Sequence, residues 1–140
     1  MPWTTIGLTT WGRAARAAAF AGSMGLGVML QACTPPVIAI DGDKLRDGKE
    51  VIRIMGLDAP EIEHAKCDAE RALGQRAKAR LEQLMATGPV VIERSDKKDR
   101  SGQTLARVLI AGRDAAAILI EERLAAPWDG GPISPSWCPA

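Results

Sequence analysis

The sequence contains no tyrosine, one phenylalanine and one histidine, and aromatic residues make up 4% of its 140 residues. A surface that binds nucleic acid by stacking bases on aromatic rings is therefore poorly supplied. The sequence also lacks an excess of either charge, because 18 basic and 17 acidic residues give a formal net charge of +1. Such a chain has no overall positive field to attract nucleic acid or acidic lipid. Any anion must be held by a local site, and the length allows one domain.

The N-terminal segment lacks acidic residues, since none precedes Cys33. Residues 17–30 form an uncharged apolar run that follows Arg13 and Arg16. The run is too short to cross a bilayer comfortably as a helix. Behind a basic head, it has the length of a signal-peptide core.

Residues 30–33, Leu-Gln-Ala-Cys, resemble a bacterial lipobox, in which the cysteine is lipidated and becomes the first mature residue. We predict a signal peptide over residues 1–32, either of a lipoprotein anchored at Cys33 or of an ordinary secreted or periplasmic protein. The alternative is a buried N-terminal helix, which three glycines between residues 20 and 30 disfavour. Cleavage removes two of the 18 basic residues and leaves 16 against 17 acidic residues, a net charge of −1.

The three cysteines are Cys33, Cys67 and Cys138. If Cys33 is lipidated, the remaining pair predicts one disulfide in an oxidising compartment. The spacing does not suit a zinc site, which needs paired ligands a few residues apart. His64 precedes Cys67 by three residues, and we interpret it as a solvated loop histidine.

Hydrophobic periodicity predicts an α+β fold with most strands in antiparallel succession. The Asp47-Gly48 pair is a hairpin turn signal, and Asp68 and Asp114 are candidate helix N-caps. Five or six short strands and one long helix fit a small closed barrel of the oligonucleotide-binding (OB) type. We expect strands over residues 37–40, 44–46, 51–55, 90–92 and 104–110, helices over 69–87 and 115–122, a polar loop over 95–102 and an irregular tail over 126–140.

Four segments together resemble the thermonuclease, or staphylococcal-nuclease-like, family of secreted bacterial type: residues 40–43, 52–61, 99–106 and 137–138. The likeness covers residues 37–138. It implies a five-stranded OB-type barrel with about three helices. It also implies calcium-dependent hydrolysis of phosphodiester bonds in DNA and RNA without sequence preference, with no obligate protein partner and a monomeric protein.

The resemblance assigns Asp43 and Asp58 as calcium carboxylates, with a main-chain carbonyl near Ala59. Hard oxygen ligands of this kind suit Ca²⁺. Ala59 replaces the threonine of the family at that turn. The alternative for Asp43 is a turn aspartate that bonds its own backbone.

Arg53 matches the family's phosphate-binding arginine, and its planar fork of donors suits a phosphate. Glu61 matches the candidate general base that positions or deprotonates the attacking water. The alternatives are a surface arginine paired with Glu61 or Asp58, and a loop glutamate after Pro60.

Two positions depart from the family pattern. Lys44 replaces a threonine, and it either adds a cation near the metal or points to solvent. Gln103 replaces a second catalytic arginine and carries no charge. A transition-state arginine contributes about 10³ to 10⁵ in rate in other phosphoryl transfers. The sequence therefore predicts either a weak nuclease or a non-catalytic relative.

Other cations could take over the role of the missing arginine. Arg107 is four residues along the strand from Gln103, about 13 Å away, so it should not reach the site. Arg100, Lys97 and Lys98 lie in the predicted loop and could reach it.

The family also uses tyrosines near the nucleotide, and this sequence has none. Trp128 lies in the corresponding region, where packing in the core or tail is favoured over stacking on a base. The leading function is an exported calcium-dependent nuclease. The alternatives are a barrel that binds nucleic acid or another polyanion without cleaving it, and an envelope lipoprotein that serves a protein partner.

Overall fold

The computed structural model describes residues 36–131 and 135–139. The predicted signal peptide over residues 1–32 and the predicted lipid site at Cys33 lie outside the described residues.

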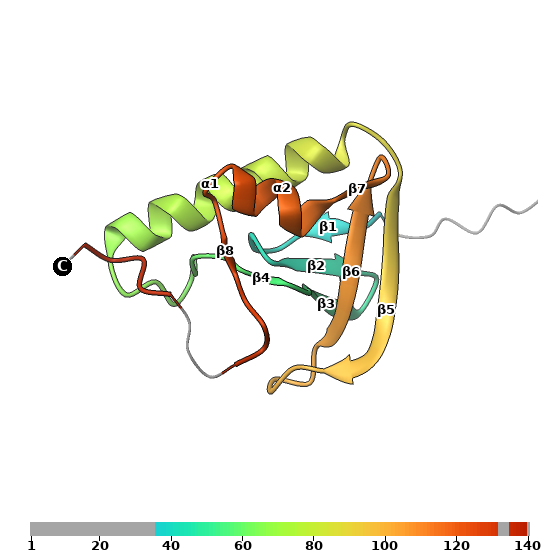
Figure 1. Ribbon diagram of the computed structural model, residues 1–140, viewed down its shortest axis with the longest axis horizontal. Helices are drawn as coiled ribbons and strands as arrows, with labels where there is room; N and C mark the ends of the chain where they lie inside the picture. Colours follow the sequence, from blue (N-terminus) through green and yellow to red (C-terminus); the bar gives the residue numbers. More distant parts are fainter. Residues whose placement is uncertain (1–35, 132–134, 140) are drawn as a thin grey trace, which may run out of the picture. The chain divides into compact units, whose positions relative to one another are not determined.

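Most of the strands form one mixed sheet in the order β1-β2-β3-β6-β5, and β7 pairs with β6 (Figure 1). The β3–β6 pair is parallel and the others are antiparallel. A separate antiparallel pair joins β4 to β8. The bounds are β1 (Ile38–Ala39), β2 (Lys44–Asp47), β3 (Glu50–Ile54), β4 (Leu57–Asp58), α1 (Asp68–Met85), β5 (Val90–Lys98), β6 (Thr104–Ile110), β7 (Arg113–Asp114), α2 (Ala115–Glu121) and β8 (Ala126–Pro127).

The core lies between the sheet and the two helices, and α2 packs against both α1 and β6 (Figure 1). Alternate residues of each strand face it, so Ile52 and Ile54 are fully buried on either side of Arg53 in the sequence. Helix α1 contributes residues at helical spacing, with Ala77 and Leu81 fully buried. The expected α+β class is therefore confirmed.

Two details differ from the expectations. Strand β5 continues through the segment expected as a loop, and only Asp99–Gly102 forms a turn. Because β5 is the last strand of the sheet, its polar side chains face solvent while its backbone pairs with β6 past a register shift between Arg94 and Lys98.

The resemblance implied about three helices, and the described residues form two. After α2 the chain turns through Arg123 at a positive φ of 58° and then enters β8.

Of the two expected helix N-caps, Asp68 and Asp114, only Asp114 is an N-cap in the structure. Asp114 caps α2, because its side chain accepts a hydrogen bond from the N–H of Ala116 at 3.0 Å. Helix α1 begins one residue earlier than expected, at Asp68, and its cap is Cys67. The extended Cys67 places its Sγ as the acceptor for the N–H of Glu70 at 3.4 Å.

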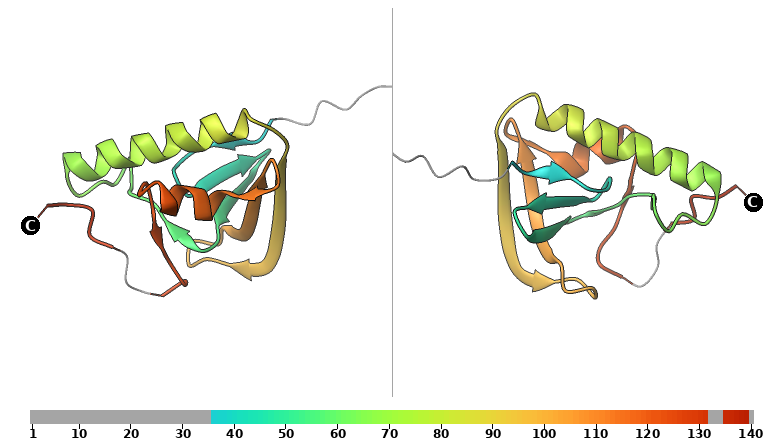
Figure 2. Two further views of the ribbon diagram at one scale, coloured as in Figure 1. Left: turned by 45° about the horizontal axis from the view of Figure 1, so that its top comes forward. Right: turned by 180° about the vertical axis from the view of Figure 1, so that it is seen from behind.

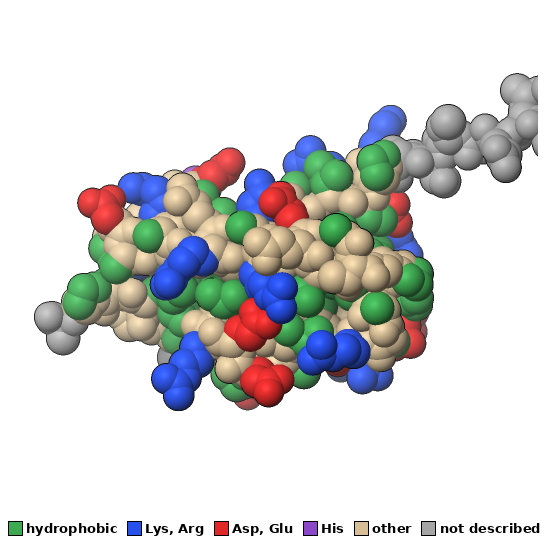
Figure 3. Space-filling view, turned by 90° about the horizontal axis from the view of Figure 1, so that it is seen from above, with side chains coloured by type: hydrophobic (Ala, Val, Ile, Leu, Met, Phe, Trp, Pro, Cys, Tyr) green, Lys and Arg blue, Asp and Glu red, His purple; other side chains and the backbone are tan. Residues whose placement is uncertain are grey.

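Several exposed charges of α1 are paired with nearby opposite charges. Figure 3 shows basic and acidic side chains interspersed on the face that carries the helices. Arg80 forms an ion pair with Glu122 at 2.7 Å, and Arg71 pairs with Asp68 at 3.0 Å. Exposed pairs of this kind add little stability. They support the interpretation of a solvated helix face rather than a nucleic-acid patch.

The predicted disulfide between Cys67 and Cys138 is present, with the two Cα atoms 6.0 Å apart. In both views of Figure 2 the C-terminal segment ends beside the first turn of α1. The bond joins residues 71 positions apart and ties the tail to that turn. Neither of the helices in the described residues is long and apolar enough to span a membrane.

Candidate active site

Helix α1 positions the two loops that carry the acidic residues. The Asp-Gly-Asp turn packs on it so closely that a Cβ at Gly42 would lie 2.7 Å from the Cβ of Ala77. One helical turn away, a Cβ at Gly74 would lie 2.5 Å from the carbonyl oxygen of Pro60. Both distances exclude a larger side chain without movement. One face of α1 therefore fixes the turn after β1 and the segment after β4.

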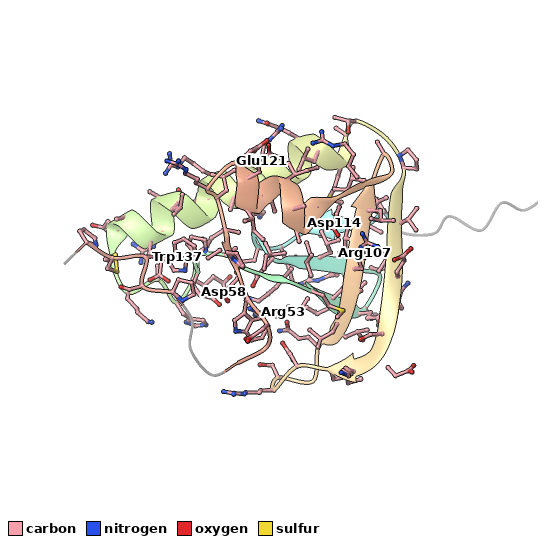
Figure 4. The ribbon with its side chains drawn as sticks, viewed as in Figure 1. Arg53, Asp58, Arg107, Asp114, Glu121 and Trp137 are labelled. Carbon is pink, nitrogen blue, oxygen red and sulfur yellow. A yellow bond between two sulfur atoms is a disulfide. The ribbon has the colours of Figure 1, made fainter. Side chains whose placement is uncertain are left out.

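Arg53 on β3 joins two buried carboxylates. Its Nη2 donates to Oδ1 of Asp58 at 2.7 Å and lies 3.0 Å from Oδ2 of Asp43. Figure 4 shows Arg53 and Asp58 pointing toward one another. Asp43 is 1% exposed and Asp58 is 7% exposed, so both carboxylates are removed from water. The structure thus brings together three of the residues that the resemblance assigned.

Lys44 lies on β2 directly opposite Arg53 in the hairpin register. Its Nζ donates to Oδ2 of Asp41 at 3.1 Å and to Oε1 of Glu61 at 3.2 Å, and it lies 3.5 Å from Oδ1 of Asp43. Of the two alternatives for Lys44, the structure shows the added cation rather than the solvent-facing side chain. We call Asp41, Asp43, Asp58 and Glu61, with the two cations, the acidic site.

Burial and charge act in opposite directions on these groups. Burial raises the pKa of Asp43 to about 6, although Lys44 and Arg53 act to lower it. Burial acts to lower the pKa of Lys44, but the carboxylates of Asp43, Asp41 and Glu61 outweigh it and raise that pKa to about 12. Lys44 is therefore fully charged at neutral pH.

Several buried polar atoms in this region make no hydrogen bond. Within the described residues, four buried side-chain atoms make no hydrogen bond: Oδ1 and Oδ2 of Asp43, Nε of Arg53, and Oε1 of Gln103. The two Asp43 oxygens have ion-pair partners in Lys44 and Arg53, so Nε of Arg53 and Oε1 of Gln103 are the atoms without any partner. A buried donor or acceptor without a partner costs about 1–3 kcal/mol. Native proteins keep few such atoms, and clusters of them call for an explanation such as a ligand or an ion.

Two cavities meet at Glu61. The larger, of about 370 Å³, is lined by Lys44, Glu61 and Gln103 together with Arg46. The smaller, of about 190 Å³, is lined by Arg53, Asp58, Glu61, Asp99, Arg100, Ser101, Trp128 and Gly131. Glu61 is the most accessible carboxylate of the acidic site, with its side chain 40% exposed. It stands where a ligand in either cavity could reach it.

Gln103 faces the acidic site, as its assigned role requires. Gly102 turns the chain at a φ of 80°, and the N–H of Gln103 then donates to Oδ1 of Asp99 at 2.8 Å. The side chain lines the larger cavity beside Lys44. It brings an amide there and no positive charge.

Of the cations that could replace the missing second arginine, only some lie near the site. Arg100 lines the smaller cavity with Arg53, whereas Lys97 and Lys98 lie on β5 and line neither of the two cavities. Arg107 donates to Asp114 at 2.9 Å. Figure 4 shows that pair away from Arg53, as the sequence predicted.

Trp128 covers Arg53. The Cζ of Arg53 lies 4.5 Å from the centroid of the Trp128 ring, which is a cation–π contact. The indole N–H donates to the carbonyl of Gly131 at 3.0 Å, and the backbone N–H donates to the carbonyl of Gly56 at 3.1 Å. Trp128 therefore packs on the tail as favoured from the sequence, and it also covers the site, which the sequence did not predict.

The residues present fit a calcium ion. The carboxylate of Asp43 is buried, and the protein's own cations, Arg53 and Lys44, lie 3.0 and 3.5 Å from its oxygens. The site therefore already holds positive charge on carboxylates, which are the hard ligands that Ca²⁺ prefers. The same nitrogen of Arg53, Nη2, contacts both Asp43 and Asp58, and buried Ala59 directly follows Asp58. The predicted loop histidine, His64, is exposed and lines the larger cavity.

Sequence reasoning missed Asp41 as a member of the site. Its Oδ1 accepts a hydrogen bond from the N–H of Gly42 at 2.9 Å, so Asp41 is the turn aspartate that Asp43 was considered to be. Its other oxygen binds Lys44. The Asp-Gly-Asp motif contained this signal, since Asp41 is two residues from Asp43.

The fold and site define a small α+β protein with buried carboxylates, an arginine and a more exposed glutamate around two adjoining cavities. A family model described as staphylococcal nuclease homologue matches residues 51–129, more than half of the chain, and the chain therefore belongs to that family. The OB-type fold expected from the sequence is the fold of this domain. The match includes Arg53 and Glu61 and begins after Asp43 and Lys44. Comparison with curated proteins gave no match.

Proposed function

We propose that the protein is a calcium-dependent nuclease that hydrolyses phosphodiester bonds in DNA and RNA without sequence preference. Family membership supports a nuclease-type function. The observation that carries the proposal is that Arg53 joins the buried carboxylates of Asp43 and Asp58 beside the more accessible Glu61, while Nε of Arg53 and Oε1 of Gln103 stay buried without a hydrogen bond. A protein that only needed stability would gain by pairing those two atoms.

The side chains divide the work of hydrolysis between them. Asp43, Asp58 and the carbonyl of Ala59 would hold Ca²⁺, which when bound supplies positive charge to the phosphate oxygens. Arg53 would bind the phosphate, and its Nε has no other acceptor. Glu61 would position and deprotonate the attacking water, once its carboxylate is released from Lys44.

Digestion of single-stranded DNA tests the proposal. Cleavage by the natural protein should appear with Ca²⁺ and stop when a chelator is added. In Asp43→Ala, addition of Ca²⁺ should no longer stimulate cleavage. If Asp43→Ala keeps full calcium-dependent cleavage, the metal assignment is wrong. If the folded natural protein binds DNA and never cleaves it, the function is that of a binding protein.

Gln103→Arg should raise kcat at least 10-fold, equivalent to about 1.4 kcal/mol. The new guanidinium would enter the larger cavity and place a charge where the transition state develops one, so kcat should change more than KM. Gln103→Met, which has a similar size and no donor, is the matched control and should show no gain. Adding Arg53→Ala should erase the gain.

An unchanged rate in folded Gln103→Arg would contradict this prediction. Arg100→Ala in the natural protein then identifies the reason, because Arg100 lines the smaller cavity beside Arg53. Loss of activity would mean that Arg100 already supplies the charge. No activity to lose would mean that the site is non-catalytic.

The second candidate function is a barrel that binds nucleic acid or another polyanion without cleaving it. Two features favour it: Gln103 is uncharged, and the carboxylate of Glu61 is engaged by Lys44. The digestion above separates the two functions.

We also propose that the protein is exported as a secreted bacterial type, with Cys33 either lipidated or near the new N-terminus. The basic and apolar leader and the Cys67–Cys138 disulfide support export. The N-terminal mass of the protein recovered from the cell envelope tests this, since lipidation at Cys33 adds a diacylglycerol. A protein that retains residues 1–32 and reduced cysteines would contradict it.

A further inference from the structure

The ammonium of Lys44 lies among carboxylate oxygens. Its ammonium lies within 3.5 Å of oxygens from three carboxylates, those of Asp41, Asp43 and Glu61. Its side chain is 14% exposed, so water does little to solvate the charge. A lysine ammonium is a compact point charge with three donors, and here the surrounding carboxylates replace its hydration shell.

The carboxylate of Asp43 is shared between the two cations of the protein. Oδ1 lies 3.5 Å from Nζ of Lys44, and Oδ2 lies 3.0 Å from Nη2 of Arg53. A calcium ion needs the same carboxylate at about 2.3–2.6 Å. An ammonium and a metal ion cannot both hold that position beside Oδ1, because like charges at contact distance repel.

The backbone holds Lys44 in place, so only its side chain can leave. Lys44 pairs with Arg53 across the hairpin. Its carbonyl also accepts hydrogen bonds from the N–H groups of Ile40 and Asp41 at 3.0 and 3.3 Å. The larger cavity, which Lys44 lines together with Arg46, gives the side chain space to move away from Asp43.

We propose that Lys44 is a tethered cation that competes with divalent metal for the acidic site. Ca²⁺ binds only when the ammonium leaves Asp43, and Lys44 therefore lowers the calcium affinity of the protein. The proposal rests on the proposed function only in its choice of Ca²⁺ as the metal. It assigns to Lys44 the control of metal occupancy.

Calorimetric titration of the full chain with Ca²⁺ tests the proposal. Lys44→Met removes the charge and keeps an unbranched side chain, and it should tighten calcium binding at least 10-fold, equivalent to about 1.4 kcal/mol. Lys49→Met is the matched control, because it removes the same charge from the exposed turn at the other end of the same hairpin. It should leave the affinity within about twofold of the natural protein, since exposed charges are screened beyond ~10 Å. Lys44→Arg keeps the charge and should bind Ca²⁺ as weakly as the natural protein.

Thermal melting with and without Ca²⁺ provides a second measurement. Lys44→Met leaves three carboxylates facing one another without their ammonium, so it should melt lower than the natural protein in chelator. Ca²⁺ at ~10 mM should raise its melting temperature more than that of the natural protein. If the variant is unfolded in chelator, the same calcium concentration should restore its fold.

Equal calcium affinities for the natural protein and Lys44→Met would overturn the proposal. So would an equal tightening in Lys49→Met, or a Lys44→Met protein that stays unfolded in Ca²⁺. The outcome is separate from that of the nuclease proposal. If Lys44→Met binds Ca²⁺ more tightly but no cleavage is seen, the role of Lys44 is supported and the nuclease proposal is contradicted. If cleavage depends on calcium but Lys44→Met binds Ca²⁺ with unchanged affinity, the nuclease proposal is supported and the role of Lys44 is contradicted.

Discussion

Arg53→Met should destabilise the fold by about 3–5 kcal/mol, the usual cost of removing one partner from a buried ion pair. Arg53 contacts Asp43 and Asp58, and the side chains of all three are at most 12% exposed. Without the guanidinium, two buried carboxylates would face each other and lose their shared cation. The measurement is chemical denaturation in chelator, monitored by tryptophan fluorescence.

The matched control is Arg94→Met. Arg94 also binds two acidic residues, Asp47 and Glu50, but its side chain is 42% exposed. Exposed pairs contribute about 0–1 kcal/mol, so the control should lose much less stability. The double variant Arg53→Met/Asp58→Asn should recover part of the loss, because it removes one of the uncompensated charges. An Arg53→Met protein as stable as the control would contradict the central role of Arg53 in the acidic site.

Removing the Cys67–Cys138 disulfide should cost roughly 4 kcal/mol of stability, from the chain entropy of the loop that the bond closes. The bond spans 71 positions and anchors the tail on the first turn of α1. Cys138→Ser should therefore lower the melting temperature by more than 10 °C, at about 4 °C or more for each kcal/mol. Scanning calorimetry of the variant and of the reduced natural protein measures the loss.

The two single variants should differ in stability. Cys67 also caps α1 through its Sγ, and serine is a favoured residue at an N-cap. Cys67→Ser should therefore lose up to about 1 kcal/mol less than Cys138→Ser. If the reduced natural protein has the same melting temperature as the oxidised protein, the bond does not constrain the unfolded chain.

The hairpin turn illustrates how far local sequence patterns reach. The Asp47-Gly48 pair indicates a turn between two strands, and the strands form where expected. The register depends on which two residues lie at the centre of the turn. In the structure Asp47 pairs with Glu50, which places Lys44 opposite Arg53. A centre one residue earlier would place Lys44 opposite Val51, and the two cations would not be direct neighbours.

The polar end of β5 was misassigned for a related reason. Residues 95–98 have the composition of a loop, and nothing local to them indicates a strand. Their strand conformation comes from pairing with β6, in which Lys98 lies opposite Thr104. Edge strands tolerate charged side chains because both faces can remain in solvent.

The sequence by itself determined the α+β class, the position of the long helix and the disulfide pair. It also identified Asp43, Arg53, Asp58, Glu61 and Gln103 as the residues to consider. The fold class and the helix follow from hydrophobic periodicity, and the disulfide follows from cysteine number. The site residues follow from the resemblance of short motifs to the staphylococcal-nuclease-like family.

Only the tertiary structure decided how these side chains are paired. Lys44 binds Glu61, which lies 17 residues further along the sequence. Arg53 on β3 contacts Trp128, which directly follows β8. Helix α1 sets the approach of the two acidic loops, through Ala77 against Gly42 and through Gly74 against Pro60. Such contacts depend on where separate elements pack and on the direction of each side chain. Local periodicity places a residue on a face of its own element and does not fix its partner on another.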